Sequence, residues 1–166
     1  GRSPEIDEKT LCRLRDSMAY RGPDGAGLYV RRNVAFAHRR LSILDLAGGH
    51  QPWVAPDESA VLVYNGEVYN FRELARKYDL EGRGHVFRSR TDTEVLLHLF
   101  EELGVEMVHE LNGMFALALW DAAEGELHLA RDRYGIKPLY WYRDDEKLQD
   151  RLREITQKQF DPRRGF

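Results

Sequence analysis

The feature that most constrains this sequence is the stretch VLVYNGEVYN at residues 61–70. Its first part, residues 61–64, is apolar and has the length and composition of a buried strand. The next dipeptide, Asn65-Gly66, tolerates positive φ and typically forms a tight turn. A strand that ends in such a turn presents a side-chain amide and a backbone N–H at one edge, and both suit a developing oxyanion. Taken alone, the stretch favours a plain hairpin or strand–helix turn.

Two helices are expected after this stretch. Asn70 can act as an N-cap, with Glu73 three residues later to complete a capping box. Residues 91–103 form the stronger pattern, with apolar residues at helical spacing and Gly104 as the C-cap. Asp92 lies at the start of that helix, where its carboxylate either caps the helix or holds an ammonium group.

The N-terminal part predicts one helix, one loop and two strands. Asp7 is a candidate N-cap for a short amphipathic helix that carries Leu11, Leu14 and Met18 on one face. Residues 20–27 contain three glycines and a proline, which predicts a loop. Short strands are predicted at residues 28–30 and 34–37.

Two adjacent arginines follow the second of these strands. Because neighbouring strand residues point to opposite faces, one of Arg39 and Arg40 can face solvent while the other turns inward. An inward guanidinium is suited to bind a carboxylate with two hydrogen bonds. A solvated, charged strand edge is the alternative. His38, beside the pair, fits a structural role better than a catalytic one.

The C-terminal part contains several further short elements. They are a strand at 85–87, a helical turn at 105–111, a β-hairpin from 115–120 and 126–130, a charged turn at 131–135, and an aromatic strand at 137–142. From residue 143 the composition becomes highly charged, with Leu148, Leu152 and Ile155 at helical spacing. This pattern predicts a surface helix over the tail.

Size and charge restrict the class of protein. A chain of 166 residues, 42% hydrophobic and 32% charged, suits one globular domain. Its 25 basic and 28 acidic residues are interspersed, so no basic surface for nucleic acid is expected. The sequence has no apolar run of membrane-spanning length and no signal-peptide pattern. Cys12 is the single cysteine, which excludes an intrachain disulfide and favours a cytoplasmic location.

Several ordered blocks together resemble one known family. The blocks are YRGPDGAG, AHRRLSILDLAGGHQP, VYNGEVYNFREL, SRTDTEVLLHLFEELG, LNGMFALALWD and LARDRYGIKPLYW. Over residues 11–141 they resemble the class II, N-terminal-nucleophile (Ntn) glutamine amidotransferase domain of asparagine synthetase. LDLAGGHQP is similar to asparagine synthetase-like amidotransferases of surface-polysaccharide gene clusters. The resemblance implies an α+β fold, a four-layer αββα sandwich of two antiparallel sheets.

The resemblance also implies a reaction. The side-chain amide of glutamine would be hydrolysed to glutamate and ammonia, and the ammonia would pass through an internal channel to an ATP-dependent synthetase domain or subunit. No cofactor is expected in this domain, since ATP and Mg²⁺ belong to the synthetase domain. The expected partners are glutamine and that synthetase, with a homodimer also compatible and no nucleic acid or membrane.

Each site residue implied by the resemblance matches a family position. Arg40 matches the arginine that binds the glutamine α-carboxylate, and Asp92 matches the carboxylate that holds the α-ammonium group. Asn65 and Gly66 match the oxyanion-hole pair. The implied substrate-binding residues are therefore Arg40, Leu41, Asn65, Gly66, Glu67 and Asp92. Residues 21–24 would form a structural loop beside the site, and residues 131–137 part of the sheet core and its domain-facing edge.

The start of the sequence departs from the family pattern. The family nucleophile is an N-terminal cysteine whose own α-amine acts as general base, whereas the printed sequence begins at Gly1, in what resembles the loop after the nucleophile strand. Ser3 lies too close to the first helix to substitute, and Cys12 lies within that helix and has no free α-amine. We therefore expect residues 1–142 to form an N-terminally truncated amidotransferase domain, inactive as given.

The tail and the function leave alternatives open. Residues 143–166 are expected to form a charged helical tail that differs from the family's synthetase domain. A non-catalytic glutamine-binding or regulatory module, or a decayed fragment, are the alternatives to a glutaminase. The ammonia acceptor, aspartate or another carboxylate, is chosen by the synthetase domain.

Overall fold

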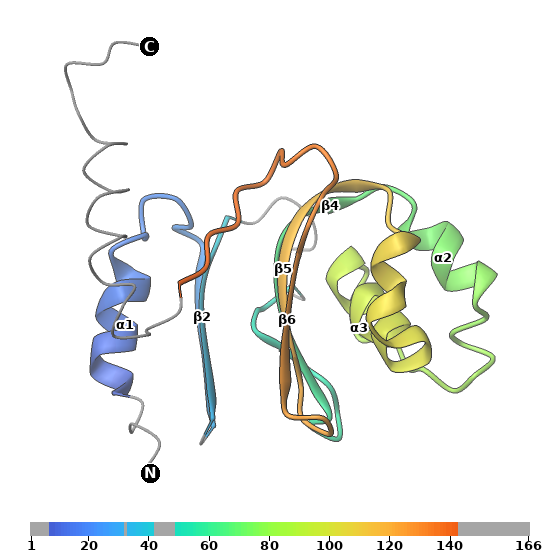
Figure 1. Cartoon of the computed structure of the whole chain (residues 1–166), viewed down its shortest axis with the longest axis horizontal. Coiled ribbons are helices and arrows are strands. Elements are labelled where there is room, and N and C mark those ends of the chain that lie inside the picture. Colours follow the sequence, from blue (N-terminus) through green and yellow to red (C-terminus); the bar gives the residue numbers. More distant parts are fainter. Residues whose placement is uncertain (1–6, 32, 42–48, 143–166) are drawn as a thin grey trace.

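The computed structural model describes residues 7–31, 33–41 and 49–142. Its elements are α1 (Glu8–Asp16), β1 (Gly25–Arg31), β2 (Val34–Arg40), β3 (Trp53–Val54), β4 (Ala60–Val68), α2 (Phe71–Lys77), α3 (Asp92–Leu103), the 3₁₀ helix η1 (Gly104–His109), β5 (Gly113–Asp121) and β6 (Glu126–Arg131). The strands form two antiparallel sheets, β1-β2 and β3-β4-β5-β6. Figure 1 shows α1 outside the smaller sheet, the larger sheet on its other side, and α2 and α3 on the far face of the larger sheet. The predicted α+β class with two antiparallel sheets is confirmed.

Strand β4 continues through Asn65-Gly66, so the turn predicted at this dipeptide is wrong. The two residues pair with Ala116 and Phe115 in an unbroken antiparallel register with β5. A Cβ at Gly66 would overlap the carbonyl oxygen of Met114 and lie 2.6 Å from the Cα of Phe115. The glycine is therefore needed for the close approach of two strands, and not for positive φ.

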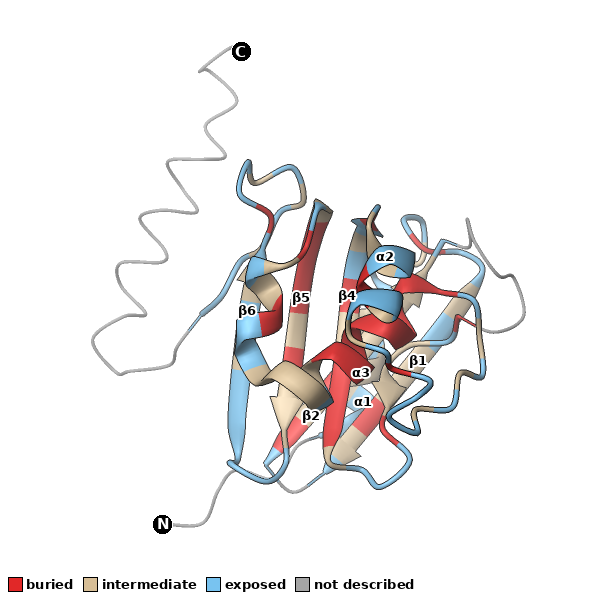
Figure 2. Ribbon diagram, turned by 90° about the vertical axis from the view of Figure 1, so that its right-hand side faces the viewer, coloured by how far each residue is buried: buried red, intermediate tan, exposed pale blue. Residues whose placement is uncertain are grey.

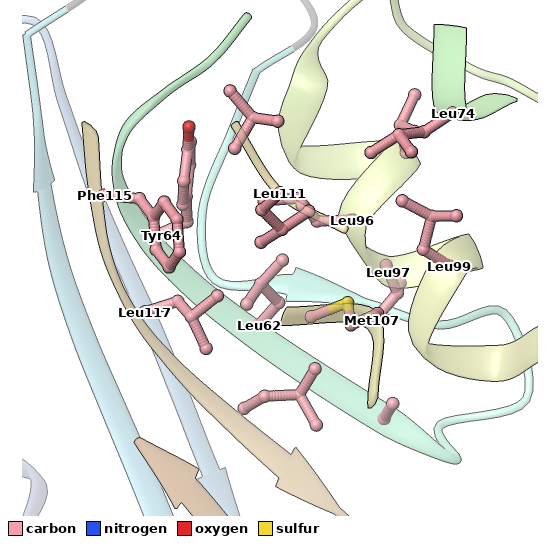
Figure 3. Close-up of a cluster of buried hydrophobic side chains, with 14 of the residues drawn as sticks. Leu62, Tyr64, Leu74, Leu96, Leu97, Leu99, Met107, Leu111, Phe115 and Leu117 are labelled. Atoms are coloured by element: carbon pink, nitrogen blue, oxygen red, sulfur yellow. The ribbon is translucent and has the colours of Figure 1, made fainter. Parts of the chain in front are cut away.

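The larger core lies between the four-stranded sheet and the helices α2, α3 and η1. Figure 2 shows buried positions along β4, β5 and α3, and Figure 3 shows their side chains meeting in one cluster. Its most completely buried large side chains are Leu62, Val68, Leu80, Leu96, Leu97, Leu99, Met107 and Leu119. Full burial of one such side chain contributes about 1.5–3 kcal/mol, so this cluster is the main source of stability.

A smaller core lies between the two sheets. Tyr29, Val34 and Phe36 of the smaller sheet pack there with Val61 of β4. Because side chains alternate along a strand, the residues of β4 at odd positions face the smaller sheet. Asn65 shares this face with Val61, at the end of β4 where burial gives way to exposure.

Helix α1 begins where the sequence predicts. Asp7 is its N-cap, and Oδ1 accepts the backbone N–H of Lys9 at 3.1 Å. Cys12 is half-buried, which agrees with a packing role. Strand β1 starts at Gly25, inside the segment predicted as a loop, because Gly25 already pairs with Arg40 in the ladder with β2. The loop prediction is therefore wrong for residues 25–27 and agrees with the structure for residues 20–24.

Helix α2 starts after Asn70, but the predicted capping box does not form. Asn70 makes no side-chain bond to the helix. Its Nδ2 instead donates to the carbonyl of Glu110 at 2.9 Å, and its Oδ1 accepts the N–H of Asn112 at 3.0 Å. The side chain thus ties the start of α2 to the loop that enters β5.

The strongest local patterns are confirmed. α3 spans Asp92–Leu103 and ends at Gly104, whose φ of 59° is in the left-handed region that favours glycine. The helical turn after it is η1, and β5 and β6 form the predicted hairpin. α3 has 12 residues, and none of the helices in the described part of the chain combines the length and apolar character that crossing a bilayer requires.

The strand predicted at residues 85–87 is wrong. The backbone N–H of His85 donates to the carbonyl of Leu80 at 3.0 Å, which ends the preceding turn. The ring of Phe87 packs edge-on against His98 of α3, with ring centroids 5.0 Å apart. The segment therefore packs on a helix and does not join a sheet.

The strand predicted at residues 137–142 is also wrong. Asp132 is buried, and its carboxylate accepts the backbone N–H groups of Ile136 and Lys137, each at 3.0 Å. These N–H groups are thereby unavailable to a β ladder, and they help to lower the pKa of Asp132. Tyr140 is left 86% exposed. The predicted tail helix, residues 143–166, lies outside the described residues.

His38 is half-buried near the end of β2, and its buried Nδ1 atom has no hydrogen-bond partner in the part of the chain that the structure describes. Burial, and next the positive charge of Arg40, lower the pKa of His38 from 6.5 to about 4. The ring is therefore neutral at pH 7, which agrees with a structural role.

We predict that Gly66→Ala destabilises the domain by about 1–3 kcal/mol, the usual cost of overpacking. The added methyl would meet backbone atoms of β5, which cannot rotate away. Gly25→Ala is the matched control, because a Cβ there lies an ordinary 3.5 Å from Arg40 Cβ. Denaturant midpoints measure both changes, and equal stability of the two variants would contradict the role assigned to Gly66.

We also predict that the unfolding free energy falls as pH is lowered from 6.5 to about 4. In this window the unfolded state binds a proton at His38 that the folded state excludes, so stability rises with pH, by up to on the order of 3 kcal/mol. His38→Gln should flatten the pH dependence between these values. His109→Gln, at an exposed histidine, is the control and should leave it unchanged.

Candidate functional site

Asp92 is the centre of the candidate site. It is the first residue of α3 and is only 7% exposed. Its Oδ2 accepts the Tyr64 hydroxyl at 2.7 Å and the Val68 N–H at 2.9 Å, and its Oδ1 accepts the Thr93 N–H at 2.9 Å. The N-cap is Thr91, so simple capping by Asp92 is wrong, and the carboxylate instead joins the start of α3 to β4.

The hydroxyl of Tyr64 is a fixed donor to this carboxylate. Burial, and next the charge of Asp92, raise the pKa of Tyr64 well above its usual value. The backbone N–H of the same residue donates to Oε1 of Gln51 at 2.6 Å. Side chain and backbone of Tyr64 are thus both held, and they orient Asp92.

Asn65 and Glu67 follow on the other face of β4. Both are exposed, while Tyr64 and Val68 on the opposite face are buried. The side-chain amide of Asn65 is therefore accessible at the end of the strand that Asp92 contacts. Gly66, between them, keeps β4 and β5 close at this end.

Arg40 and Thr91, the residue before Asp92, both lie against Gly49. A Cβ at Gly49 would overlap Nη2 of Arg40 and lie 3.3 Å from Cγ2 of Thr91. The guanidinium therefore occupies space that the missing side chain leaves, directly beside the residue before Asp92. Three sequence-distant segments, the end of β2, the loop before β3 and the start of α3, meet at this point.

Arg39 points to the opposite face, which confirms the predicted alternation. Its Nε donates to the carbonyl of Gly22 at 2.9 Å, and its Nη1 lies 3.6 Å from Oδ1 of Asp16. The expectation that this second arginine faces solvent is wrong, because its side chain is only 16% exposed and packs against α1.

The loop at residues 21–24 lies beside Arg40, as expected. The N–H of Asp24 donates to the carbonyl of Arg40 at 3.0 Å, and Pro23 forms an isolated bridge with the same residue. Leu41 follows Arg40 beyond the end of β2 and is 58% exposed. Its place in the site depends on residues 42–48, which lie outside the described residues.

Sequence reasoning missed three members of this cluster. Tyr64 contributes a hydroxyl and Gln51 an amide oxygen. Gly49 has no side chain and so leaves room for the Arg40 guanidinium. One signal was available: a tyrosine in an otherwise aliphatic buried run needs a partner for its hydroxyl. The contacts of Gln51 and Gly49 cross between segments and carry no local sequence signal.

The arrangement suits a zwitterionic ligand. A guanidinium at Arg40 and a carboxylate at Asp92 offer opposite charges, and the exposed Asn65 amide adds a neutral donor on β4. Among the described residues, the group with geometry for a metal ion is His85, His98 and Glu101, which includes no residue of this site.

Comparison with known proteins identifies a family. Residues 2–152 match the family model of the glutamine amidotransferase domain. The chain is 43% identical over 140 residues to glutamine-hydrolyzing asparagine synthetase 2 of Bacillus subtilis (strain 168), covering 84% of this chain and 18% of that relative. It is 40% identical over 141 residues to glutamine-hydrolyzing asparagine synthetase B of Escherichia coli (strain K12), covering 85% of this chain and 25% of that relative.

A solved structure agrees with this result. Glutamine phosphoribosylpyrophosphate (PRPP) amidotransferase from B. subtilis, complexed with ADP and GMP, matches with a TM-score of 0.50 and 28% identity, over 63% of this chain and 24% of that one. The chain thus spans a quarter or less of the length of these three relatives. It belongs to the glutamine amidotransferase domain family, in the class II group related to the N-terminal domain of asparagine synthetase.

Proposed function

We propose that this domain hydrolyses the side-chain amide of glutamine to glutamate and ammonia. The observation that carries the proposal is the meeting of the Arg40 guanidinium and the Asp92 segment across Gly49. In the proposal, Arg40 binds the α-carboxylate of glutamine and Asp92 binds its α-ammonium group. Charged hydrogen bonds of this kind contribute about 1.5–3 kcal/mol each.

The end of β4 would receive the reacting amide. The side-chain N–H of Asn65 and the backbone N–H of Gly66 would donate to the oxygen that becomes negative in the tetrahedral intermediate. Loss of one such donor typically costs about 10²–10³ in kcat. Glu67, exposed two residues after Asn65 on the same face, would line the glutamine pocket.

The nucleophile in this proposal is the N-terminal cysteine of the family, at the start of a strand ahead of the printed residues. Its thiolate would attack the amide carbon, and its α-amine would pass the thiol proton to the departing ammonia. Water would then hydrolyse the thioester to release glutamate. With that strand, the layers seen in Figure 1 would correspond to the four-layer Ntn sandwich.

We further propose that the ammonia is consumed by an ATP-dependent, amide-forming domain or subunit that holds ATP and Mg²⁺. Support comes from the relatives, which are named as asparagine synthetases and of which the matched region covers only 18% and 25%. The matched region itself supplies no acceptor site in this proposal.

The direct test adds a Cys-initiated strand ahead of Gly1 and measures glutamate release from glutamine. We expect release by the extended protein, and none when its first Cys is replaced by Ser. Arg40→Gln should raise KM by about 10–100-fold through loss of a charged contact. Arg39→Gln is the matched control, because this neighbour points toward α1.

Two outcomes would contradict the proposal. One is an extended protein that binds glutamine but releases no glutamate, which would favour the non-catalytic binding module. The other is equal activity of the Arg40 and Arg39 variants. Calorimetry of the printed chain with glutamine tests binding apart from hydrolysis. A pocket formed by Arg40 and Asp92 would bind glutamine even where no glutamate is released.

Tyr64→Phe tests the orientation of Asp92. Without the hydroxyl donor at 2.7 Å, the carboxylate loses one of its three hydrogen bonds. We expect KM for glutamine to rise about 5–30-fold, equivalent to about 1–2 kcal/mol, with little change in kcat. Tyr69→Phe, at an exposed tyrosine, is the control. An unchanged KM would show that Tyr64 does not position Asp92 for the substrate.

A further inference from the structure

A second polar cluster lies on the helix layer, built from the loop before α3 and from α3 itself. His85 comes from the loop, and His98 and Glu101 come from adjacent turns of α3, three residues apart on one face. His98 follows Asp92 by six residues, which is about 9 Å along the helix axis. None of the three has a part in the proposed glutaminase site.

The three side chains converge on a single carboxylate oxygen. Oε2 of Glu101 lies 2.8 Å from Nδ1 of His98 and 3.1 Å from Nδ1 of His85. The two imidazole rings are adjacent, with centroids 4.6 Å apart. One ligand atom from each residue lies within 4.8 Å of the others. Ligand atoms around a tetrahedral Zn²⁺ are roughly 3.3 Å apart, given bonds of about 2.0–2.2 Å, so small side-chain shifts would admit an ion.

The remaining ring nitrogens are placed to support such an ion. Nε2 of His85 lies 2.8 Å from Oε1 of Glu102, so a proton on Nε2 leaves the lone pair of Nδ1 directed at the cluster. Arg83 holds the same Glu102 at 2.6 Å. A carboxylate behind a histidine is the usual support of a metal ligand, since it fixes both the tautomer and the ring.

The buried ring of His98 gives an independent reason. Its side chain is only 6% exposed, and its Nε2 has no hydrogen-bond partner among the described residues. If Nδ1 carries the proton to Glu101, Nε2 presents a lone pair 4.0 Å from Oε1 of Glu94, another acceptor. If Nδ1 binds a metal, Nε2 carries the proton and directs an N–H toward that carboxylate. The metal-bound tautomer therefore suits the surroundings better.

We propose that His85, His98 and Glu101 form a binding site for a divalent transition-metal ion of the Zn²⁺ type, with Glu102 as a positioning residue behind His85. Two imidazole nitrogens and one carboxylate oxygen favour Zn²⁺ over Mg²⁺ or Ca²⁺, which prefer oxygen ligands. Three protein ligands leave the fourth position to water, and the side chain of Glu101 is 23% exposed, which gives the ion access.

Such an ion would link the loop that follows α2 to helix α3. The contacts of Arg83 and His85 with Glu102 already join the loop to the helix, as does the Phe87–His98 ring contact. The Glu94 carboxylate also accepts the N–H groups of Arg88 and Ser89 at 2.7 Å. Binding to the folded state alone stabilises it in proportion to the logarithm of the free ion concentration. The site would therefore act on the stability of α3, the helix that begins with Asp92.

Zinc titration of the full printed chain tests this site. We expect one Zn²⁺ per chain by calorimetry, a melting temperature that rises with zinc concentration, and a visible d–d absorption band when Co²⁺ is used instead. Glu101→Gln should weaken Zn²⁺ binding by at least about tenfold, and Glu102→Gln by about 10–100-fold. His85→Asn should abolish the Co²⁺ band.

His109→Gln is the matched control. His109 and Glu106 form another His–Glu pair three residues apart, but both side chains are largely exposed, at 73% and 77%. This variant should bind Zn²⁺ as the unchanged protein does. The proposal would be overturned if the protein bound no zinc, or if the Glu101 and His85 variants bound zinc as well as the unchanged protein does. The cluster would then be a set of His–Glu hydrogen bonds and ion pairs only. Circular dichroism confirms that each variant is folded, and glutamine hydrolysis is not part of the readout.

Discussion

The arrangement of the candidate site depends on the carboxylate of Asp92. It accepts two hydrogen bonds from β4, at Tyr64 and Val68, and one from the first turn of its own helix. Through these bonds, one buried charge sets how α3 lies on the larger sheet. A buried carboxylate without donors is strongly unfavourable, so the sheet and the helix must present their donors in this geometry. The same geometry directs the carboxylate toward the end of β4, where Asn65 and Gly66 lie.

Glycine makes the close approaches around this carboxylate sterically possible. A side chain at Gly49 would overlap the Arg40 guanidinium, and one at Gly66 or Gly113 would overlap a carbonyl oxygen of the paired strand. All three are used for proximity, and none of them has positive φ. The candidate site is therefore shaped as much by absent side chains as by the charged ones. This explains how Arg40 and the start of α3 both come to lie against Gly49.

Local patterns predicted the parts of the fold that local energetics decide. The α3 helix with Gly104, the α1 cap at Asp7 and the β5–β6 hairpin depend on periodicity and capping over a few residues. Predictions failed where a residue distant in the sequence forms the hydrogen bonds that decide the local structure. Asn65-Gly66 stays in a strand because β5 pairs with it. The Asn70 side chain bonds to the loop before β5 and does not cap α2. The Asp132 carboxylate accepts backbone N–H groups of the expected last strand.

Some residues of the candidate site could also be predicted from the sequence, and others could not. Arg40, Asn65, Gly66 and Asp92 came from a family resemblance, and the alternation of Arg39 and Arg40 came from strand geometry. Tyr64, Gln51 and Gly49 act only through contacts between segments, which the order of residues does not encode locally.

The central claim is that Arg40, Asp92 and the end of β4 together bind glutamine. A crystal structure of the Cys-extended protein, with its nucleophile replaced by Ser and glutamine bound, tests it most directly. We expect the α-carboxylate on the Arg40 guanidinium, the α-ammonium on Asp92 and the side-chain carbonyl oxygen beside Asn65 and the Gly66 N–H. Glutamine bound elsewhere, or bound here with its α-ammonium away from Asp92, would contradict the account.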